Sequence, residues 1–387
     1  MVAARDLRNR NLLLLLQSLR AREAMSRAQL AEEVGLSVPS VHRLMADLTA
    51  MGWAEPTTAG PTTGRQGRPT TWFRFRAERA VLAGVDVGSE TTRVAVGTLS
   101  GAVEAVHEIA TADLQDDLSK GLAAVIRRST MSRGGDATPL AGIAVGVPSV
   151  VDAEGVLVRP WLKEEWAGVP LRSQLETELG CQVTVAQDNH LSALAETSPS
   201  GTAPGVRSVL VVELGIGIGM GMALDGYLVA GSHGGFGRLM GWPCSAPRGA
   251  GALGASLGEL LTADGLLRQY AWRGGRSSPQ GGAALLEAAR GGDRSAAAVV
   301  RWAARELSDV LLRLALAVDP DVIVLGGGLG RGLHEAGLVS DLKASSYRSE
   351  VPVVPSVLRA DSVVTGALIA ARDHVPGWVA TQIETTV

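Results

Sequence analysis

The sequence has few cysteines and no long apolar run. Of its 387 residues only Cys181 and Cys244 are cysteines, and they lie far apart without a CxxC spacing. They can build neither a disulfide framework nor a cysteine-based zinc site, which fits a reducing compartment. No apolar run is long enough to cross a bilayer, and Leu12–Leu16 is shorter than the core of a secretion signal. We therefore expect a cytoplasmic protein without a membrane partner.

Charge is unevenly distributed along a chain whose net charge is −3. Residues 1–80 carry twelve arginines or lysines against seven acidic residues, a net charge of +5, and the remainder carries 24 against 32, a net charge of −8. A basic head on an acidic body favours contact between the head and a polyanion. The alternative is a small helical cap whose arginines are merely solvated.

Residues 26–54 predict two short helices around a tight turn. Ser26 begins the first helix, Gly35 ends it, and Ser37 is the expected N-cap of the second. The apolar stripe of the second helix comprises Val41, Leu44, Met45 and Leu48. The residues that we expect to face DNA are Ser37, Pro39, Ser40, His42 and Arg43. This pattern is typical of a helix-turn-helix, whose second helix enters the major groove.

The next stretch predicts a β wing. It is rich in turn residues and arginine, and then alternates apolar and basic residues from Trp72 to Arg76. Arg65 and Arg68 lie beside glycines, on flexible backbone from which guanidinium groups can enter a narrow A/T-rich minor groove. We therefore predict a winged helix-turn-helix domain over residues 1–79 that binds double-stranded DNA at an A/T-rich site.

The body, from residue 80 onward, has an α/β pattern that occurs twice. A strand, a glycine turn and a second strand are expected within residues 81–110 and again within 206–232, where glycines alternate from Gly215 to Gly221. Two similar α/β halves that meet at a cleft are the expected outcome. Near the end, Gly326–Gly328 follow a buried strand and permit close approach of a flat ligand, or simply of a crowded helix.

These segments together resemble the ROK family over nearly the whole chain. The motifs, in the family's order, are GVDVGSETTRVAV (84–96), GVPSVVD (146–152), VAQDNHLSALAE (185–196), VELGIGIGMGMALDG (212–226) and DPDVIVLGGGLG (319–330). The family joins bacterial sugar kinases to transcriptional repressors on one actin-like, hexokinase-like ATPase fold with ribonuclease H-like lobes. The resemblance implies that residues 80–387 form a two-lobed effector-binding and oligomerisation domain, with a sugar or related metabolite between the lobes. It also implies a homodimer or tetramer, whose paired heads would read a pseudo-palindromic operator.

The resemblance further implies that the nucleotide site is degenerate. The family's first phosphate turn ends in threonine, where this chain has Glu90, and its second has a threonine where this chain has Ile216. Losing a hydrogen bond to a charged phosphate oxygen costs about 1.5–3 kcal/mol. The loop residues concerned are Asp86, Gly88, Ser89, Gly215, Gly217, Gly219, Gly326 and Gly327. We therefore expect no kinase activity, no catalytic residue and no cofactor.

The family's sugar site survives only in part. Asp188 stands where the kinases have their general base, although an aspartate there can also cap the following helix. The candidate effector-binding residues are Gln187, Asp188, His190, Arg238 and Trp161. Arg238 replaces a sugar-binding glutamate, which favours an anionic ligand unless Arg238 pairs with Glu213.

The family's structural zinc site has lost its ligands. Gly241 replaces the ligating histidine, and Ser245, Pro247 and Ala252 align with the cysteines, so we expect no metal.

Three functions therefore compete at the level of the sequence. The first is a regulator, a repressor by preference, controlled by a sugar or sugar-derived effector. The second is an ATP-dependent sugar kinase with an added DNA-binding head. The third is a DNA-binding scaffold that responds to no ligand.

Overall fold

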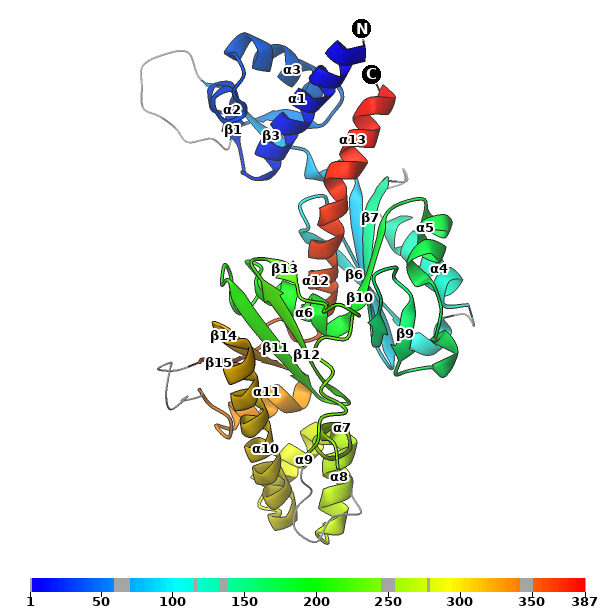
Figure 1. Ribbon diagram of the computed structural model, residues 1–387, viewed down its shortest axis with the longest axis vertical. Coiled ribbons are helices and arrows are strands. Elements are labelled where there is room, and N and C mark those ends of the chain that lie inside the picture. The colour runs from blue at the N-terminus through cyan, green and yellow to red at the C-terminus, as the bar shows by residue number, and fades with distance from the viewer. Residues whose placement is uncertain are drawn as a thin grey trace.

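The computed structural model describes residues 2–58, 70–114, 117–131, 138–244, 255–276, 279–341 and 351–386. It consists of a small head and two larger lobes arranged along one long axis (Figure 1). The elements of the head are α1 (Val2–Arg20), β1 (Met25–Ser26), α2 (Arg27–Val34), α3 (Val38–Ala50), β2 (Ala54–Thr57) and β3 (Trp72–Phe75). No helix within these ranges combines the length and the apolarity that a membrane span requires.

The predicted helix-turn-helix is confirmed, together with the residues that delimit it. Ser26 caps α2 in a reciprocal capping box with Gln29, and Gly35 ends that helix in the left-handed conformation at φ 67°. The Ser37 hydroxyl accepts a hydrogen bond from the Ser40 backbone N–H and so caps α3. Strands β2 and β3 pair antiparallel, as a wing requires, and β1 completes the sheet in the order β1-β3-β2.

The first helix of the head was not predicted. The apolar run that is too short for a secretion signal lies in the middle of α1, and its leucines Leu12, Leu15, Leu16 and Leu19 are almost fully buried. These positions have the i, i+3, i+4, i+7 spacing of a helical stripe, so the signal was present in the sequence. The stripe packs against α2, α3 and β3 and completes the core of the head.

The first lobe contains a five-stranded mixed sheet. Its strand order is β10-β7-β4-β5-β6, with β4, β7 and β10 parallel and β5 and β6 antiparallel to their neighbours. The elements of this lobe are β4 (Val81–Val87), β5 (Thr91–Thr98), β6 (Val103–Ala110), α4 (Leu118–Met131), β7 (Leu140–Val147), β8 (Ser149–Val151), β9 (Leu157–Pro160), α5 (Leu171–Leu179) and β10 (Val183–Gln187).

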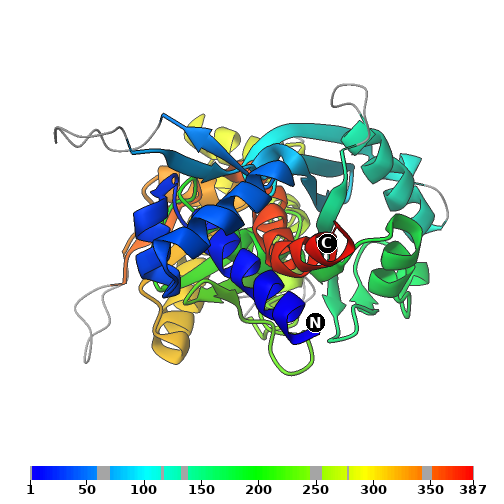
Figure 2. The same ribbon diagram turned by 90° about the horizontal axis from the view of Figure 1, so that it is seen from above.

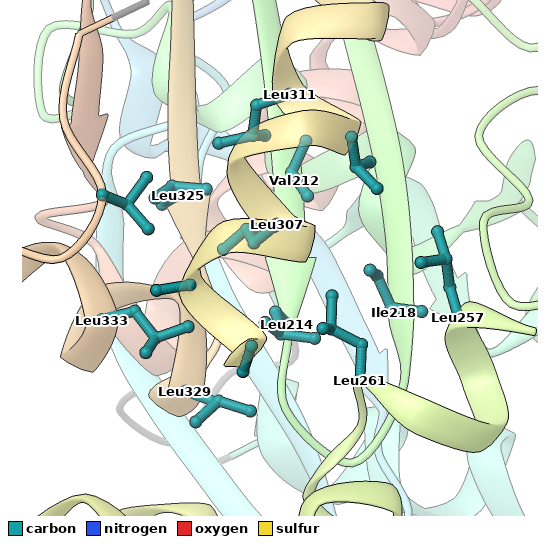
Figure 3. Close-up of a cluster of buried hydrophobic side chains, with 14 of the residues drawn as sticks. Val212, Leu214, Ile218, Leu257, Leu261, Leu307, Leu311, Leu325, Leu329 and Leu333 are labelled. Carbon is teal, nitrogen blue, oxygen red and sulfur yellow. The ribbon is translucent and has the colours of Figure 1, made fainter. Parts of the chain in front are cut away.

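The second lobe repeats this topology, which confirms the predicted duplication. Its sheet order is β13-β12-β11-β14-β15, again with three parallel strands and two antiparallel ones. Its elements are β11 (Ser208–Leu214), β12 (Ile218–Leu224), β13 (Tyr227–Leu228), α7 (Leu257–Leu260), α8 (Ala263–Trp272), α9 (Gly281–Arg290), α10 (Arg294–Val318), β14 (Val322–Gly326), α11 (Gly328–Glu335) and β15 (Val353–Pro355). Figure 3 shows how α10 covers this sheet, with Leu307 and Leu311 facing Val212 and Leu325.

Two helices lie between the two lobes (Figure 1). α6 (Asp188–Glu196) and α12 (Ser362–Ala371) pack against each other, and α12 also covers β4 and β7 of the first lobe. A short 3-10 turn, η6 (Arg372–His374), links α12 to α13 (Val375–Thr386). α13 lies beside α1 in both views (Figures 1 and 2), and one hydrophobic cluster runs from the head through α13 and α12 into the first lobe.

Adding a methyl group at Gly366 should destabilise this central layer. A Cβ atom there would lie 1.8 Å from the backbone oxygen of Leu191, so α6 and α12 would have to move apart. We expect Gly366→Ala to lower the free energy of unfolding by about 1–3 kcal/mol, the usual cost of overpacking. Denaturant unfolding followed by circular dichroism measures this change. Gly241→Ala is the control, because its Cβ would meet no atom of the described residues within 4 Å, and equal stability of the two variants would contradict the prediction.

Candidate functional site

A cleft between the two lobes is the candidate ligand site. Its cavity volume is about 790 Å³, and it is lined by the carboxyl ends of β4, β10 and β11 together with the first residues of α6 and α12. The carboxyl ends of strands, at the junction of two sheets, are where open α/β folds bind their ligands. The two halves predicted to meet at a cleft therefore do so.

The cleft brings together most of the residues that the sequence singled out. Predicted residues with surface on it are Asp86, Gly88, Ser89, Trp161, Gln187, Asp188, Gly215, Gly217, Gly219, Arg238 and Gly327. Gly326 and His190 do not line it. The sequence reasoning missed Asn189, Arg359 and Ser362 as lining residues, and it named Glu213 only as a partner for Arg238.

Three carboxylates lie together in the cleft. Burial raises the pKa of Asp86 to about 7, and the negative charge of Asp188 adds to this effect. Burial likewise raises the pKa of Asp188 to about 6, and burial together with the charge of Asp188 raises that of Glu213 to about 7. Each side chain keeps some exposed surface, yet protein atoms surround it closely enough to desolvate the charge. Near neutral pH each of these carboxyl groups is therefore partly protonated.

Asp188 also stabilises the helix that it begins. It is the first residue of α6, and its carboxylate accepts a hydrogen bond of 2.7 Å from the Asn189 backbone N–H. Negative charge at the N-terminus of a helix is favourable. The N-cap of α6 is Gln187, so Asp188 supports the helix from its first turn and not as the predicted cap, while part of its surface lines the cleft.

His190 belongs to the packing of the lobes and not to the cleft. Its side chain is 2% exposed, and Nε2–H donates a hydrogen bond of 3.0 Å to the backbone oxygen of Phe236. Burial lowers the pKa of His190, so the ring is neutral. The first turn of α6 points Asp188 toward the cleft and His190 away from it, and we therefore withdraw His190 as a ligand contact.

Arg238 lines the cleft and is exposed, and it does not pair with Glu213. Among the described residues no carboxylate lies within ion-pair distance of its guanidinium group. Trp161 also lines the cleft, with 41% of its side chain exposed, whereas Trp166 is buried in the core of the first lobe. Of the two tryptophans only Trp161 is placed to stack on a ring.

The glycines of the two turns are required by the packing of the lobe itself, and not only by the approach of a ligand. Gly327 has a φ of 68°, and a Cβ atom there would lie 2.2 Å from the backbone oxygen of Leu214. A Cβ at Gly326 would lie 2.3 Å from the carboxylate of Glu213. Ile216, at the tip of the second turn, is 72% exposed and lines the cleft. A nucleotide phosphate would thus meet an apolar side chain and a carboxylate there.

The head exposes a small polar and basic surface on α3. Ser37, Pro39, His42 and Arg43 are exposed and Ser40 is half-buried, while the four predicted stripe residues are buried. Most other arginines of the head have structural partners: Arg8 pairs with Asp47, Arg22 with Glu33 and Arg74 with Glu55, and Arg27 and Arg79 stack on aromatic rings. Arg43 has no such partner within the described ranges, so its donors are available.

Two predicted features lie outside the described residues. Arg65 and Arg68 belong to the wing segment 59–69, and the stretch where the family holds zinc falls within 245–254. The predictions made for these positions stay predictions.

The acids of the cleft predict an unusual pH dependence of stability. A carboxyl group whose folded-state pKa lies above its unfolded value stabilises the folded state at low pH, and this stabilisation is lost as the pH rises through the folded-state pKa. For Glu213 the window runs from about pH 4.5 to about 7.

We therefore expect Glu213→Gln to be more stable than the parent protein at pH 8 by roughly 1–2 kcal/mol, allowing for the partial exposure of the group. The difference should shrink or reverse at pH 5, and thermal unfolding of both proteins across this range measures it. A difference that does not change with pH would contradict the assigned pKa.

Similarity to known proteins covers both parts of the chain. The ROK family model matches residues 82–374, and the model of the IclR helix-turn-helix domain matches residues 10–57. A glucokinase of Halalkalibacterium halodurans is 27% identical over 64% of this chain and 80% of its own length. A xylose repressor of Caldicellulosiruptor bescii is 26% identical over a region that comprises 58% of this chain and 56% of the repressor.

A solved structure has the same fold over almost the full length. It is that of a ROK family transcriptional regulator, a homologue of the E. coli MLC protein, with a TM-score of 0.75. The superposition covers 98% of this chain and 100% of the regulator's chain, and the two sequences are 19% identical.

Proposed function

The chain belongs to the ROK family and carries an N-terminal helix-turn-helix domain, and on that premise we propose that it is a DNA-binding transcriptional regulator, a repressor, whose DNA affinity is set by a small sugar or sugar-derived effector. The observation that carries the proposal is the single hydrophobic cluster that joins the head to the lobes through α12 and α13. Because α12 begins at the cleft and α13 ends beside α1, an occupied cleft can change the position of the head.

The DNA contacts follow from the geometry of the head. The exposed residues of α3 would enter the major groove, with Arg43 as the bidentate donor to a base or phosphate. Arg65 and Arg68 would enter the flanking minor groove from the wing. A homodimer would place two heads on a pseudo-palindromic, A/T-rich operator, and its affinity would fall steeply with salt because arginines release counterions from phosphates. Such a protein acts in the cytoplasm, where bacterial DNA is found.

The effector contacts would come from both lobes. Gln187 and Asp188 would bind hydroxyl groups of the ligand, Trp161 would stack on its ring, and Arg238 would meet its more exposed end.

A sugar kinase is the second candidate, favoured by the similarity to glucokinases. Phosphoryl transfer needs a nucleotide and its metal held beside the sugar, with positive charge around the phosphates. In this chain the same space contains Glu213 in addition to the base candidate Asp188, and the exposed Ile216 stands in the second turn where the family has threonine. The charge and the shape therefore both oppose a bound nucleotide.

Genome-wide mapping of the DNA bound by the full chain, followed by titration of metabolites against the recovered site, tests the proposal. We expect one site class to be bound much more tightly than random DNA and one class of small molecule to change that affinity. ATP consumption is measured in parallel with a panel of sugars. Turnover of ATP that Asp188→Asn abolishes would overturn the proposal in favour of a kinase, and specific DNA binding that no metabolite changes would favour a ligand-independent scaffold.

A further inference from the structure

A second cavity lies between the head and the first lobe. Its volume is about 300 Å³, at the lower end of the roughly 300–1,000 Å³ that is usual for small-molecule sites. The residues that line it are Gln17, Arg20 and Ala21 at the end of α1, Phe75 of β3, Ser100 in the turn between β5 and β6, and Arg372 of η6. None of them lines the cleft between the lobes, so this cavity is a separate site.

Two arginines line this cavity without a counter-charge. Arg20 is half-buried and Arg372 is exposed, and within the described residues neither forms an ion pair or a side-chain hydrogen bond. Burial lowers the pKa of Arg20, and the positive charge of Arg372 lowers it further. Asp373 acts in the opposite direction, but it forms no ion pair with Arg20 and does not line the cavity. Since arginine is not deprotonated in proteins, the cavity carries two positive charges.

The contacts of the two arginines leave their donors free. The Arg20 guanidinium lies over the Phe75 ring, 6.0 Å from its centroid, and Phe75 is itself buried. A Cβ atom at Gly101 would lie 3.8 Å from Cδ of Arg372, so the aliphatic stem of Arg372 lies beside the turn between β5 and β6. Neither contact occupies an N–H group. The donors of both guanidinium groups are therefore available to a ligand.

Two uncharged side chains add further donors to the cavity. The Gln17 amide carries two N–H donors, and within the described residues it has no side-chain hydrogen bond. The Ser100 hydroxyl lies 2.7 Å from the Thr98 hydroxyl, and either oxygen can be the donor of that bond. When Thr98 donates, the Ser100 hydrogen is free to turn to a ligand. Positive charge and donors together are complementary to an oxyanion, which has only acceptors and negative charge.

We propose that this cavity binds a phosphate-type oxyanion, either inorganic phosphate or the phosphate group of a small metabolite, as a bridge between the head and the first lobe. Only six residues line the cavity, so a ligand that fills it touches both Arg20 and Arg372. Planar guanidinium groups bind phosphate oxygens in pairs, and an anion between them replaces repulsion by attraction. Because η6 joins α12 to α13, a bound anion would restrain the head without any ligand in the cleft.

Calorimetric titration of the full chain in phosphate-free buffer at low salt tests the proposal. The probes are inorganic phosphate, glucose 6-phosphate and, as the uncharged comparison, glucose. We expect Arg20→Gln and Arg372→Gln each to weaken phosphate binding at least tenfold, as expected for the loss of hydrogen bonds to a charged oxygen. Arg128→Gln is the matched control, because Arg128 is an exposed arginine of α4 that does not line the cavity, and it should retain the parent affinity.

The two phosphate probes identify the source of the anion. Glucose 6-phosphate that binds more tightly than inorganic phosphate, with the same sensitivity to both arginine variants, would identify a phosphorylated metabolite as the ligand. Equal or weaker binding would identify free phosphate. Glucose should give no heat that either variant removes.

Thermal unfolding gives a readout that a merely structural arginine would not produce. Without the anion the two guanidinium groups repel each other, so Arg372→Gln should unfold at the same temperature as the parent protein or higher. With saturating phosphate the parent should unfold at the higher temperature, because a ligand bound to the folded state stabilises it. The general stabilising effect of phosphate salts acts on both proteins and cancels in the comparison.

DNA binding distinguishes this cavity from the surface that reads DNA. α3 lies at the end of the head away from the lobes (Figure 1). In phosphate-free buffer Arg20→Gln and Arg372→Gln should therefore bind the mapped DNA site within threefold of the parent affinity.

Any of four results would overturn the proposal. They are no saturable binding of either phosphate probe, phosphate binding that both arginine variants retain, phosphate binding that is lost in Arg238→Gln of the cleft instead, or an equal gain in unfolding temperature from phosphate in Arg372→Gln and the parent. A tenfold loss of DNA affinity in either variant without phosphate would also overturn it, since the arginines would then contact DNA. Absence of specific DNA binding in the parent would refute the proposed function and leave the anion site intact.

Discussion

Replacing Arg43 by glutamate abolishes specific DNA binding if α3 is the recognition helix. Arg43 is exposed on the outer face of α3, next to His42, and no described side chain pairs with it. A bidentate arginine contact to a base is worth about 1–3 kcal/mol, and a dimer makes it twice. The new carboxylate also faces phosphates. We therefore expect affinity for the mapped site to fall by at least a hundredfold, measured by fluorescence anisotropy at several salt concentrations.

Two further variants separate base recognition from general charge. Arg43→Lys keeps the positive charge but loses the planar fork, so it should reduce the preference for the mapped site over random DNA while retaining non-specific binding. Arg128→Glu makes the same charge reversal at an exposed position of α4 in the first lobe, and it should leave DNA binding unchanged. Wild-type affinity in Arg43→Glu would mean that another surface reads the DNA.

Structural features that depend only on residues close together in the sequence could be predicted from the sequence. Ser26, Gly35 and Ser37 determine where the helices of the head begin and end, because caps depend on the residue itself and on backbone donors within one turn. The duplicated sheets were predictable for a similar reason. In each lobe the first strand, its glycine turn and the antiparallel partner strand are consecutive in the sequence, so the pattern can be recognised locally. The family resemblance added the order of the motifs, and with it the expectation that the lobes meet at a cleft.

Features that depend on the assembled lobes were not predictable from local pattern. Glu213 comes near the end of a buried strand, and nothing in its neighbourhood indicates that it lines the same cleft as Asp86 and Asp188. His190 was named as a ligand contact because it belongs to the stretch Gln187–His190 that resembles the family's sugar-binding motif, but α6 turns it toward Phe236. α13 was not anticipated as part of the head's support, because its contacts with α1 join the two ends of the sequence.

The junction of α13 with the head is where coupling between effector and DNA should be most sensitive. Trp378 of α13 meets Trp53 of the head edge-on, with ring centroids 5.7 Å apart and an interplanar angle of 77°. Trp53 is 1% exposed, stacks on Phe75 and lies under the guanidinium of Arg79. At the other end of the segment formed by α12, η6 and α13, Arg93 binds Asp361, just before α12. This segment is thus anchored to the first lobe near the cleft and to the head at Trp53.

Trp378→Ala should therefore uncouple the effector from DNA. An aromatic pair of this kind contributes about 0.5–1.5 kcal/mol beyond the burial of its surface, so its loss loosens the contact of α13 with the head without unfolding the head's own core. We expect the change in DNA affinity caused by the effector to fall from tenfold or more to within twofold. Affinity for the effector alone and DNA binding without it should stay within about fivefold of the parent values, because neither site contains Trp378.

Thermodynamic linkage makes this result measurable from both sides. An effector that changes DNA affinity by a given factor must have its own affinity changed by DNA by the same factor, so both titrations should lose their coupling together in Trp378→Ala. Trp272→Ala is the matched control, because Trp272 is 45% exposed on α8 of the second lobe, and it should retain full coupling. Full coupling in Trp378→Ala would show that the signal travels instead through the connection from β3 to β4, since that connection joins the head to the first lobe covalently, whereas α13 reaches the head only by packing.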